Sequence, residues 1–222
     1  MASEGSLHAG CPRSCSCVRS LMNNLQVLVA QIGTRSARAQ PRTMLLDESD
    51  LPGDGWRLCS QRSWRMGAWG VPPSDANRRA CQAGLFTGSR VFKQASPTRW
   101  LSTQVLQFAS ILDAQSEVPG MQERLMPNPR AKVTIVDERT IHGHRVAGLA
   151  SLWVFEQLTV GLERPTYTRY VAGNVEHVVM MLMCTGNRGQ WPWDEVMSIA
   201  TMQSSKVRAI ISNRTGPSRL SR

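Results

Sequence analysis

Residues 178–183 read Val178-Val179-Met180-Met181-Leu182-Met183, and this run decides how the chain folds. Every position is apolar, so a strand formed here must bury both of its faces instead of alternating between core and solvent. A strand of that kind lies in the middle of a sheet and has other structure packed on each side. We therefore expect a central strand over residues 175–184.

The residues before this run predict its first neighbour. Gly173-Asn174 separates it from a second β-rich stretch over residues 166–172, and both residue types accept the positive φ that tight hairpin turns need. The two stretches are therefore expected to pair as an antiparallel hairpin. Residues 56–58, 102–109, 133–138 and 152–160 have the composition of further strands.

The residues after the run predict a long helix. Pro192 suits a first helical turn, Asp194 and Glu195 oppose the positive end of the helix dipole, and Asn213 is expected to end the helix. Apolar residues recur at helical spacing along one stripe, which comprises Val196, Ile199, Ala200, Val207, Ile210 and Ile211. Shorter helices are expected over residues 74–84 and after Ser110. The element order predicts an α+β fold, with a curved antiparallel sheet, helices packed on one face and a long C-terminal helix.

The charge of the chain is concentrated at its ends. The 222 residues carry a net charge of +10, with 41% hydrophobic and 19% charged residues, which is close to the average for folded proteins. Residues 1–43 hold five arginines and one glutamate, and residues 208–222 hold four arginines and no acid, so the middle is nearly balanced. We expect no specific nucleic-acid partner, although the arginine-rich tails can contact anionic surfaces. The sequence predicts a basic leader over 1–43, one α+β domain over 44–212 and a basic tail over 213–222.

The leader has some features of an export signal. Arg13 and Arg19 precede a mostly apolar stretch over residues 21–32, and Ala37-Arg38-Ala39 offers a small-residue cleavage pattern before Gln40. The sequence has no run of 18 apolar residues, so no transmembrane helix is expected. We favour a location outside the cytoplasmic membrane, in the cell envelope or secreted, with a cytoplasmic location as the alternative.

Two groups of residues have the chemistry of cross-links or metal ligands. Cys59 and Cys81 flank a Gly- and Pro-rich segment, which a disulfide between them would order in an exported protein. In a cytosolic protein the same cysteines, with Cys184, are expected as buried thiols. His142 and His144 would share one side of an extended strand, but the sequence offers no third ligand, so no metal and no cofactor is expected.

The sequence carries no common catalytic signature. Nucleotide-binding, nucleophile-elbow and zinc-hydrolase patterns are all missing from it, so no catalytic residues are assigned and no enzymatic activity is expected. Trp64, Trp69 and Trp100 lie in or beside irregular segments, where partly exposed indoles can line an apolar cleft. These three residues are the candidate ligand-binding group, and packing under loops is the alternative.

Several motifs occur in the same order as in a known group of proteins. They are Leu45-Leu46 to Gly55-Trp56, Gln104 to Phe108 followed by Asp113-Ala114, the hairpin residues Tyr170 to Val175, and the closing helix. In these motifs the chain resembles actinobacterial exported lipoprotein and sensor-type domains, including the extracellular domains of mycobacterial receptor serine/threonine kinases. The resemblance implies an α+β domain outside the cytoplasmic membrane that binds a small or lipophilic envelope ligand and has no enzymatic activity.

Two other functions stay open from the residues alone. A cytosolic metal-dependent hydrolase would use His142 and His144, and tightly bound metal would identify it. A tail-mediated interaction protein would bind acidic partners through its arginine-rich ends, and removal of residues 1–43 and 208–222 would abolish that binding.

Overall fold

The computed structural model of the protein describes residues 41–65, 74–119, 121, 134–143, 145–160 and 165–215. Two 3-10 helices come first, η1 (Pro41–Met44) and η2 (Glu48–Asp50). The elements that follow are β1 (Trp56–Arg65), α2 (Asp75–Gln82), β2 (Phe86–Gln94), β3 (Arg99–Gln107), α3 (Ile111–Glu117), β4 (Thr134–Thr140), β5 (Leu152–Val160), β6 (Pro165–Val175), β7 (Val178–Gly186) and α5 (Trp193–Thr215). The predicted domain boundaries stay a prediction, because residues 1–40 and 216–222 lie outside the described residues.

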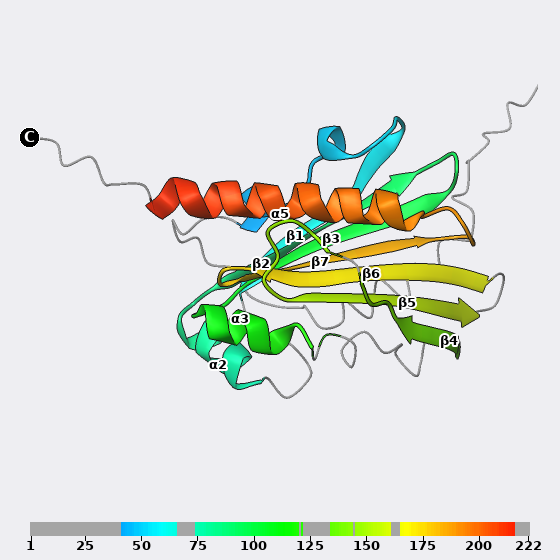
Figure 1. Ribbon diagram of the computed structural model, residues 1–222. Helices are drawn as coiled ribbons and strands as arrows, with labels where there is room; N and C mark the ends of the chain where they lie inside the picture. The colour runs from blue at the N-terminus through cyan, green and yellow to red at the C-terminus, as the bar shows by residue number, and fades with distance from the viewer. Residues whose placement is uncertain are drawn as a thin grey trace, which may run out of the picture.

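The strands of the described chain form one open antiparallel sheet in the order β1-β2-β3-β7-β6-β5-β4 (Figure 1). The predicted central strand, β7, lies between β3 and β6, with three strands beyond it on each side. The α+β fold class and the long closing helix are both confirmed.

Both faces of β7 are buried, as its apolar sequence predicts. Met180 and Leu182 pack into the core beneath α5, whereas Val179, Met181 and Met183 pack into a second core with α2 and α3. The helices therefore cover the two faces of the sheet, not one face as expected (Figure 1). The reason lies in β7 itself, because a strand that is apolar on both sides needs cover on both sides.

The β6–β7 hairpin is present, but its turn lies three residues later than predicted. Glu176 and His177 form the turn, and Glu176 has a positive φ of 49°. Gly173 instead lies inside β6, where a Cβ would collide with the carbonyl oxygen of Ser151 and lie 2.6 Å from Leu149 Cδ1. Glycine is needed there because the segment before β5 crosses β6 at close range, not because the chain turns.

Two strands were underestimated from the sequence. β1 extends to Arg65 instead of ending at residue 58, and β2 was not expected at all. β2 has adjacent residues Val91 and Phe92 that point into different cores, and its other positions are largely polar. Pairing with β1 and β3 along nearly its whole length holds β2 in place, and this pairing is invisible in the local sequence.

Residues 41–50 form an N-terminal strap that crosses the α5 face of the sheet. Met44, Leu45 and Leu46 are almost completely buried in the core beneath α5. Gly88 in β2 makes room for the strap, because a Cβ there would lie 2.9 Å from Pro41 Cβ. The strap therefore closes the part of this face beside α5.

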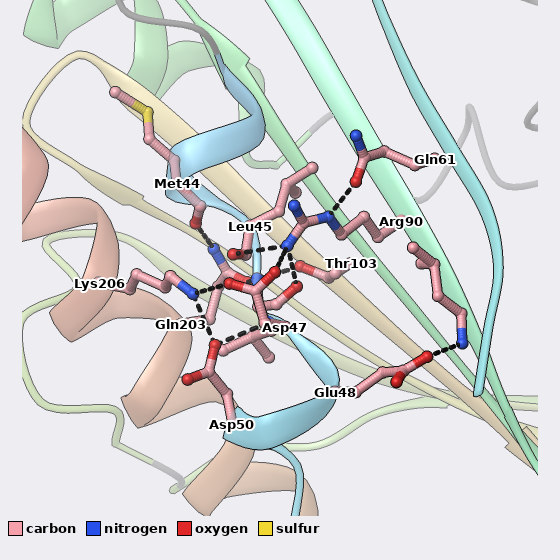
Figure 2. A network of polar contacts seen from close by, with 12 residues as sticks. Met44, Leu45, Asp47, Glu48, Asp50, Gln61, Arg90, Thr103, Gln203 and Lys206 are labelled. Carbon is pink, nitrogen blue, oxygen red and sulfur yellow. Dashed lines mark hydrogen bonds and ion pairs between the residues drawn. The ribbon is translucent and has the colours of Figure 1, made fainter. Parts of the chain in front are cut away.

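Polar side chains fasten the strap to α5 and to the sheet (Figure 2). Gln203 of α5, fully buried, accepts hydrogen bonds from Thr103 Oγ1 at 2.6 Å and from the Leu46 amide at 3.3 Å, and donates to the Met44 carbonyl. Buried backbone groups of the strap thus find partners on a helix far away in the sequence.

A second layer of this network is ionic (Figure 2). Lys206 Nζ lies 2.6 Å from carboxylate oxygens of both Asp47 and Asp50. Arg90 of β2 donates to the Leu46 carbonyl at 2.7 Å and forms an ion pair with Asp47. The strap is consequently held from one side by α5 and from the other by β2.

No helix within the described residues combines the length and apolar character needed to cross a bilayer.

Candidate functional site: a polar pocket beside the closing helix

The α5 helix covers only part of its face of the sheet. It packs on β6 and β7, and β5 and β4 lie beyond it (Figure 1). On the uncovered part, the strand register aligns Glu156 of β5, Arg169 of β6 and Cys184 of β7 in one row. The next row places Asp137, Leu158 and Tyr167 side by side. Charged side chains therefore gather beside the start of α5, where the helix leaves the sheet uncovered.

This region is concave and forms a pocket of about 380 Å³. Its floor comes from strands β4 to β7 and one wall comes from the β7–α5 connection. The lining residues are Asp137, Glu156, Leu158, Tyr167, Arg169, Cys184, Asn187, Arg188, Gly189 and Trp191. The volume falls within the range of small-molecule sites, at its lower end.

Arg169 is the most strongly fixed side chain of the pocket. Its Nε donates to Glu156 Oε2 at 2.6 Å, its Nη1 donates to the Trp191 carbonyl, and its guanidinium carbon lies 4.4 Å from the centre of the Trp193 ring. The Arg169 and Glu156 side chains are only 20% and 11% exposed. An ion pair this well covered holds both groups in one orientation.

The rim of the pocket carries a second guanidinium group. Arg188 lies in the β7–α5 connection, with its guanidinium carbon 6.0 Å from the centre of the Tyr167 ring. The Gln190 amide donates to the Asn187 carbonyl at 3.2 Å, and Gly189 takes a φ of +79°, so the connection forms a defined turn. This turn presents Arg188 to the pocket.

Cys184 lies beneath the pocket and is completely buried. Burial raises the pKa of its thiol, and the negative charge of Glu195 raises it further. The thiol therefore stays protonated at neutral pH, and a protonated thiol is a poor nucleophile.

Arg99 anchors the wall of the pocket to the sheet. Arg99 of β3 forms a two-pronged ion pair with Glu195 of α5, at 2.8 Å for each oxygen, and donates to the Gln190 carbonyl at 2.9 Å. Its guanidinium carbon lies 4.2 Å from the Trp191 ring centre and 5.2 Å from that of Trp56. The start of α5 is thereby fixed relative to the pocket.

The structure does not bring the predicted tryptophan group together. Trp64 pairs with Thr87 of β2 and Trp100 with Lys93, so the two indoles are six residues apart along β2, or about 20 Å. Trp64 is buried, and Trp100 is partly buried with the Lys93 ammonium 5.1 Å from its ring centre. These two tryptophans pack on the sheet and do not line one cleft, while Trp69 lies outside the described residues.

The predicted disulfide is not formed in the structure. Cys59 lies at a bulge in the edge strand β1, and Cys81 lies in the last turn of α2. Both thiols are exposed, and no bond joins them. The pairing of Cys59 with Cys81 in oxidised protein stays a prediction. Of the three thiols expected to be buried in a cytosolic chain, only Cys184 is buried.

The histidine pair is only partly visible. His142 is exposed in the connection after β4, and His144 lies outside the described residues. Among the residues that the structure describes, no group of three or more His, Cys, Asp or Glu side chains converges to hold a metal ion. The metal-dependent hydrolase therefore stays a prediction without a described site.

Sequence reasoning missed the residues of the pocket. None of Asp137, Glu156, Arg169 and Arg188 is among the candidate residues that the sequence predicts. An acidic and a basic residue placed opposite each other on one face of two neighbouring strands would have indicated the pocket. That signal requires the register of β5 against β6, which the local sequence does not specify.

Comparisons with known proteins support the fold. No family model matches the chain, and no curated protein matches it either. Among solved structures, the chain is similar to the crystal structure of the extracellular domain of PknH from Mycobacterium tuberculosis, with a TM-score of 0.51 and 13% sequence identity. The match covers 79% of this chain and 100% of that one. The chain therefore has the fold of this extracellular domain, as its motif order led us to expect, and the sensor, lipoprotein and actinobacterial parts of the resemblance stay predictions.

Proposed function

We propose that the protein is a non-enzymatic, sensor-like domain that works outside the cytoplasmic membrane and binds a small ligand in the pocket between strands β4 to β7 and the β7–α5 connection. The observation that carries this proposal is the row of Glu156 and Arg169, two ion-paired groups held in fixed orientation at the base of a concave surface. Charged groups held in a concave site with an adjacent apolar surface are candidates for ligand binding.

The chemistry of the pocket favours binding over turnover. Glu156 is engaged by Arg169, and Cys184 is a buried, protonated thiol, so neither group is available as a base or nucleophile. Arg169 is a permanent cation that cannot transfer a proton at physiological pH. Such groups orient and neutralise a ligand without reacting with it.

The extracytoplasmic location rests on the fold of the PknH extracellular domain and on the signal-like features before Gln40. The test is the cell fraction and the N-terminal residue of the native protein. A mature start near Gln40 in the envelope or the medium supports the location, and an uncleaved chain confined to the cytosol contradicts it.

Ligand binding is tested by thermal-shift screening of the full chain against a library of small polar and amphipathic metabolites. Hits are then measured with Arg188→Ala and Tyr167→Ala, two substitutions at the rim that leave the core intact. We expect at least a tenfold loss of affinity in both. Arg62→Ala, at an exposed position on the distant strand β1, is the matched control and should bind normally.

Two outcomes would contradict the proposal. Hits that bind Arg188→Ala and Tyr167→Ala as tightly as the parent chain would place the ligand elsewhere. Mass spectrometry shows whether a hit is converted to a product. If it is, and if both variants lose this conversion, the protein is an enzyme.

A further inference from the structure

The base of the pocket offers hydrogen-bond donors that no described group uses. Arg169 has five N–H donors. Its Nε and Nη1 are engaged by Glu156 and by the Trp191 carbonyl, whereas Nη2 makes no hydrogen bond within the described residues. Because the other two nitrogens and the Trp193 ring fix the guanidinium plane, the Nη2 donors keep a constant direction. A fixed, partly covered guanidinium edge suits a carboxylate or another oxyanion.

The rim adds charges of both signs. Arg188 contacts the Tyr167 ring but forms no ion pair with any described carboxylate. Asp137, on the edge strand β4, is exposed and likewise forms no ion pair with a described cation. Glu156 and Arg169 form an ion pair, so among the described residues that line the pocket Arg188 and Asp137 remain as one positive and one negative side chain outside any described ion pair.

We infer that the ligand of this pocket is a small zwitterion with the charge pattern of a free amino acid or a short peptide. Its anionic group binds Arg169 Nη2 and Arg188, and its ammonium group binds Asp137. This inference rests on the proposed function and specifies the ligand class for the same site. The net neutrality of the pocket disfavours a strong anion, which would leave Asp137 as an uncompensated repulsive charge.

The remaining surface sets the size and polarity of the ligand. Leu158 and Tyr167 provide an apolar patch between the charged groups, and they lie side by side in the strand register. A pocket of about 380 Å³ admits a molecule of amino-acid or dipeptide size with an apolar side chain. L-Leucine is therefore a suitable probe.

The test compares probes that share one carbon skeleton and differ in charge. L-Leucine carries both charges, 4-methylpentanoate lacks the ammonium group, and 3-methylbutylamine lacks the carboxylate. D-Glucose serves as an uncharged polyol. Dissociation constants come from backbone amide shifts of Arg169 and residues 187–189 in the ¹⁵N-labelled full chain. We expect each singly charged analogue to bind at least tenfold more weakly than L-leucine.

Single substitutions then assign each charge. Asp137→Asn should weaken L-leucine at least fivefold and leave 4-methylpentanoate unchanged. Arg188→Gln should weaken both of these and leave 3-methylbutylamine unchanged. Arg62→Gln, on β1, is the matched control and should change nothing. Both pocket substitutions lie at exposed positions, and unchanged amide spectra outside the pocket verify that the fold is retained.

The results separate this inference from the proposed function. If L-leucine and its singly charged analogues bind with equal affinity, or if D-glucose binds more tightly, the inferred zwitterionic ligand is wrong. The proposed ligand-binding pocket would still stand. Shifts that map away from the pocket, or no shifts with any probe or library hit, overturn both.

Discussion

Three arginines, Arg90, Arg99 and Arg169, each reach from a strand to a segment outside the sheet. Arg90 holds the strap, Arg99 holds Glu195 at the start of α5, and Arg169 holds the carbonyl of Trp191. In each case the planar guanidinium contacts both a backbone carbonyl and a carboxylate. At the scale of single residues, these three arginines therefore fix the strap and the start of α5 to the strands of the sheet.

The Arg99–Glu195 pair should be important for stability. The side chain of Arg99 is 10% exposed and that of Glu195 is 22% exposed, so removal of Arg99 leaves a carboxylate largely covered and unpaired. We expect Arg99→Met to lower the free energy of unfolding in urea by about 3 kcal/mol. Arg99→Lys should lie between that variant and the parent chain, because an ammonium cannot make both contacts with the carboxylate. A loss for Arg99→Met no larger than that of exposed Arg62→Met would show that the pair contributes nothing.

Gly173 and Gly186 both lie in the β6–β7 hairpin and can be compared by the same substitution. A Cβ at Gly173 would collide with the Ser151 carbonyl, which is backbone. At Gly186 it would lie 2.5 Å from Gln190 Oε1, the end of a side chain that can move at the cost of one exposed hydrogen bond from the Asn187 amide. We expect Gly173→Ala to lower the free energy of unfolding by about 2 kcal/mol and Gly186→Ala to change it by less than about 0.5 kcal/mol. Chemical denaturation of both variants measures the difference, and equal losses would mean that β6 is not crossed closely by the segment before β5.

The same residues show how far local sequence predicts structure. Gly173-Asn174 correctly signals a hairpin, but these residues support the turn instead of forming it. Asn174 accepts a hydrogen bond from the Ser151 amide and donates to the Glu176 carbonyl, both at 2.9 Å. The need for glycine at position 173 comes from a segment 22 residues away, so residue type alone could not distinguish a turn from a close crossing.

At the scale of elements, α5 and the strap stabilise each other. Gln203 and Lys206 stand one turn apart on α5 and contact the strap at its buried and its exposed side, respectively. The α5 helix was predictable from its own stripe of apolar residues. The strap was not, because its fixed position depends on side chains from α5 and β2 that are distant in the sequence.

Removal of the Lys206 charge should loosen the strap without unfolding the sheet. Lys206→Met keeps the aliphatic stem but loses both carboxylate contacts, at a cost of about 1 kcal/mol in the free energy of unfolding. Amide exchange should rise in residues 45–51 more than in β7. In 1 M salt the cost should shrink, because the pair is partly exposed. A uniform rise in exchange across the sheet would contradict a local role of the strap.

The contribution of this ionic network should depend on pH in a defined way. Burial raises the pKa of Asp47, but the Lys206 hydrogen bond and the charge of Arg90 outweigh it, so the pKa lies below its ordinary value of 3.8. Desolvation lowers the pKa of Lys206, but the hydrogen bonds to Asp47 and Asp50 outweigh it, so the pKa lies above 10.5. A lowered carboxyl pKa stabilises the fold above the unfolded value, and a raised amine pKa stabilises it below the unfolded value.

The stability difference between the parent chain and Lys206→Met should therefore be constant from about pH 5 to about pH 9. It should decrease as the pH falls from 3.8 through the lower pKa of folded Asp47, and as it rises from 10.5 through the higher pKa of folded Lys206. Urea denaturation at a series of pH values measures this difference. A difference that varies within the neutral range would mean that another group controls the strap.

At the scale of the whole molecule, the fold was far more predictable than the site. One apolar run and one amphipathic helix were enough to predict the central strand, its cover and the α+β class. The pocket brings together Asp137, Glu156, Arg169 and Arg188 from three strands and a connection. Their proximity depends on strand order and register, which no local pattern contains. The predicted tryptophan group depends on strand order in the same way. Trp64 and Trp100 lie on one face of the sheet but at opposite ends of β2, and the role of Trp69, outside the described residues, stays a prediction.

The most direct test of a ligand site at the open end of the α5 face is a crystal structure of the protein soaked with a fragment library. We expect bound fragments to gather between Arg169, Tyr167 and the β7–α5 connection, with a polar group on Arg169 Nη2. Fragments that gather beside Trp100 or Trp64, while the pocket between β4 and β7 holds none, would contradict the account.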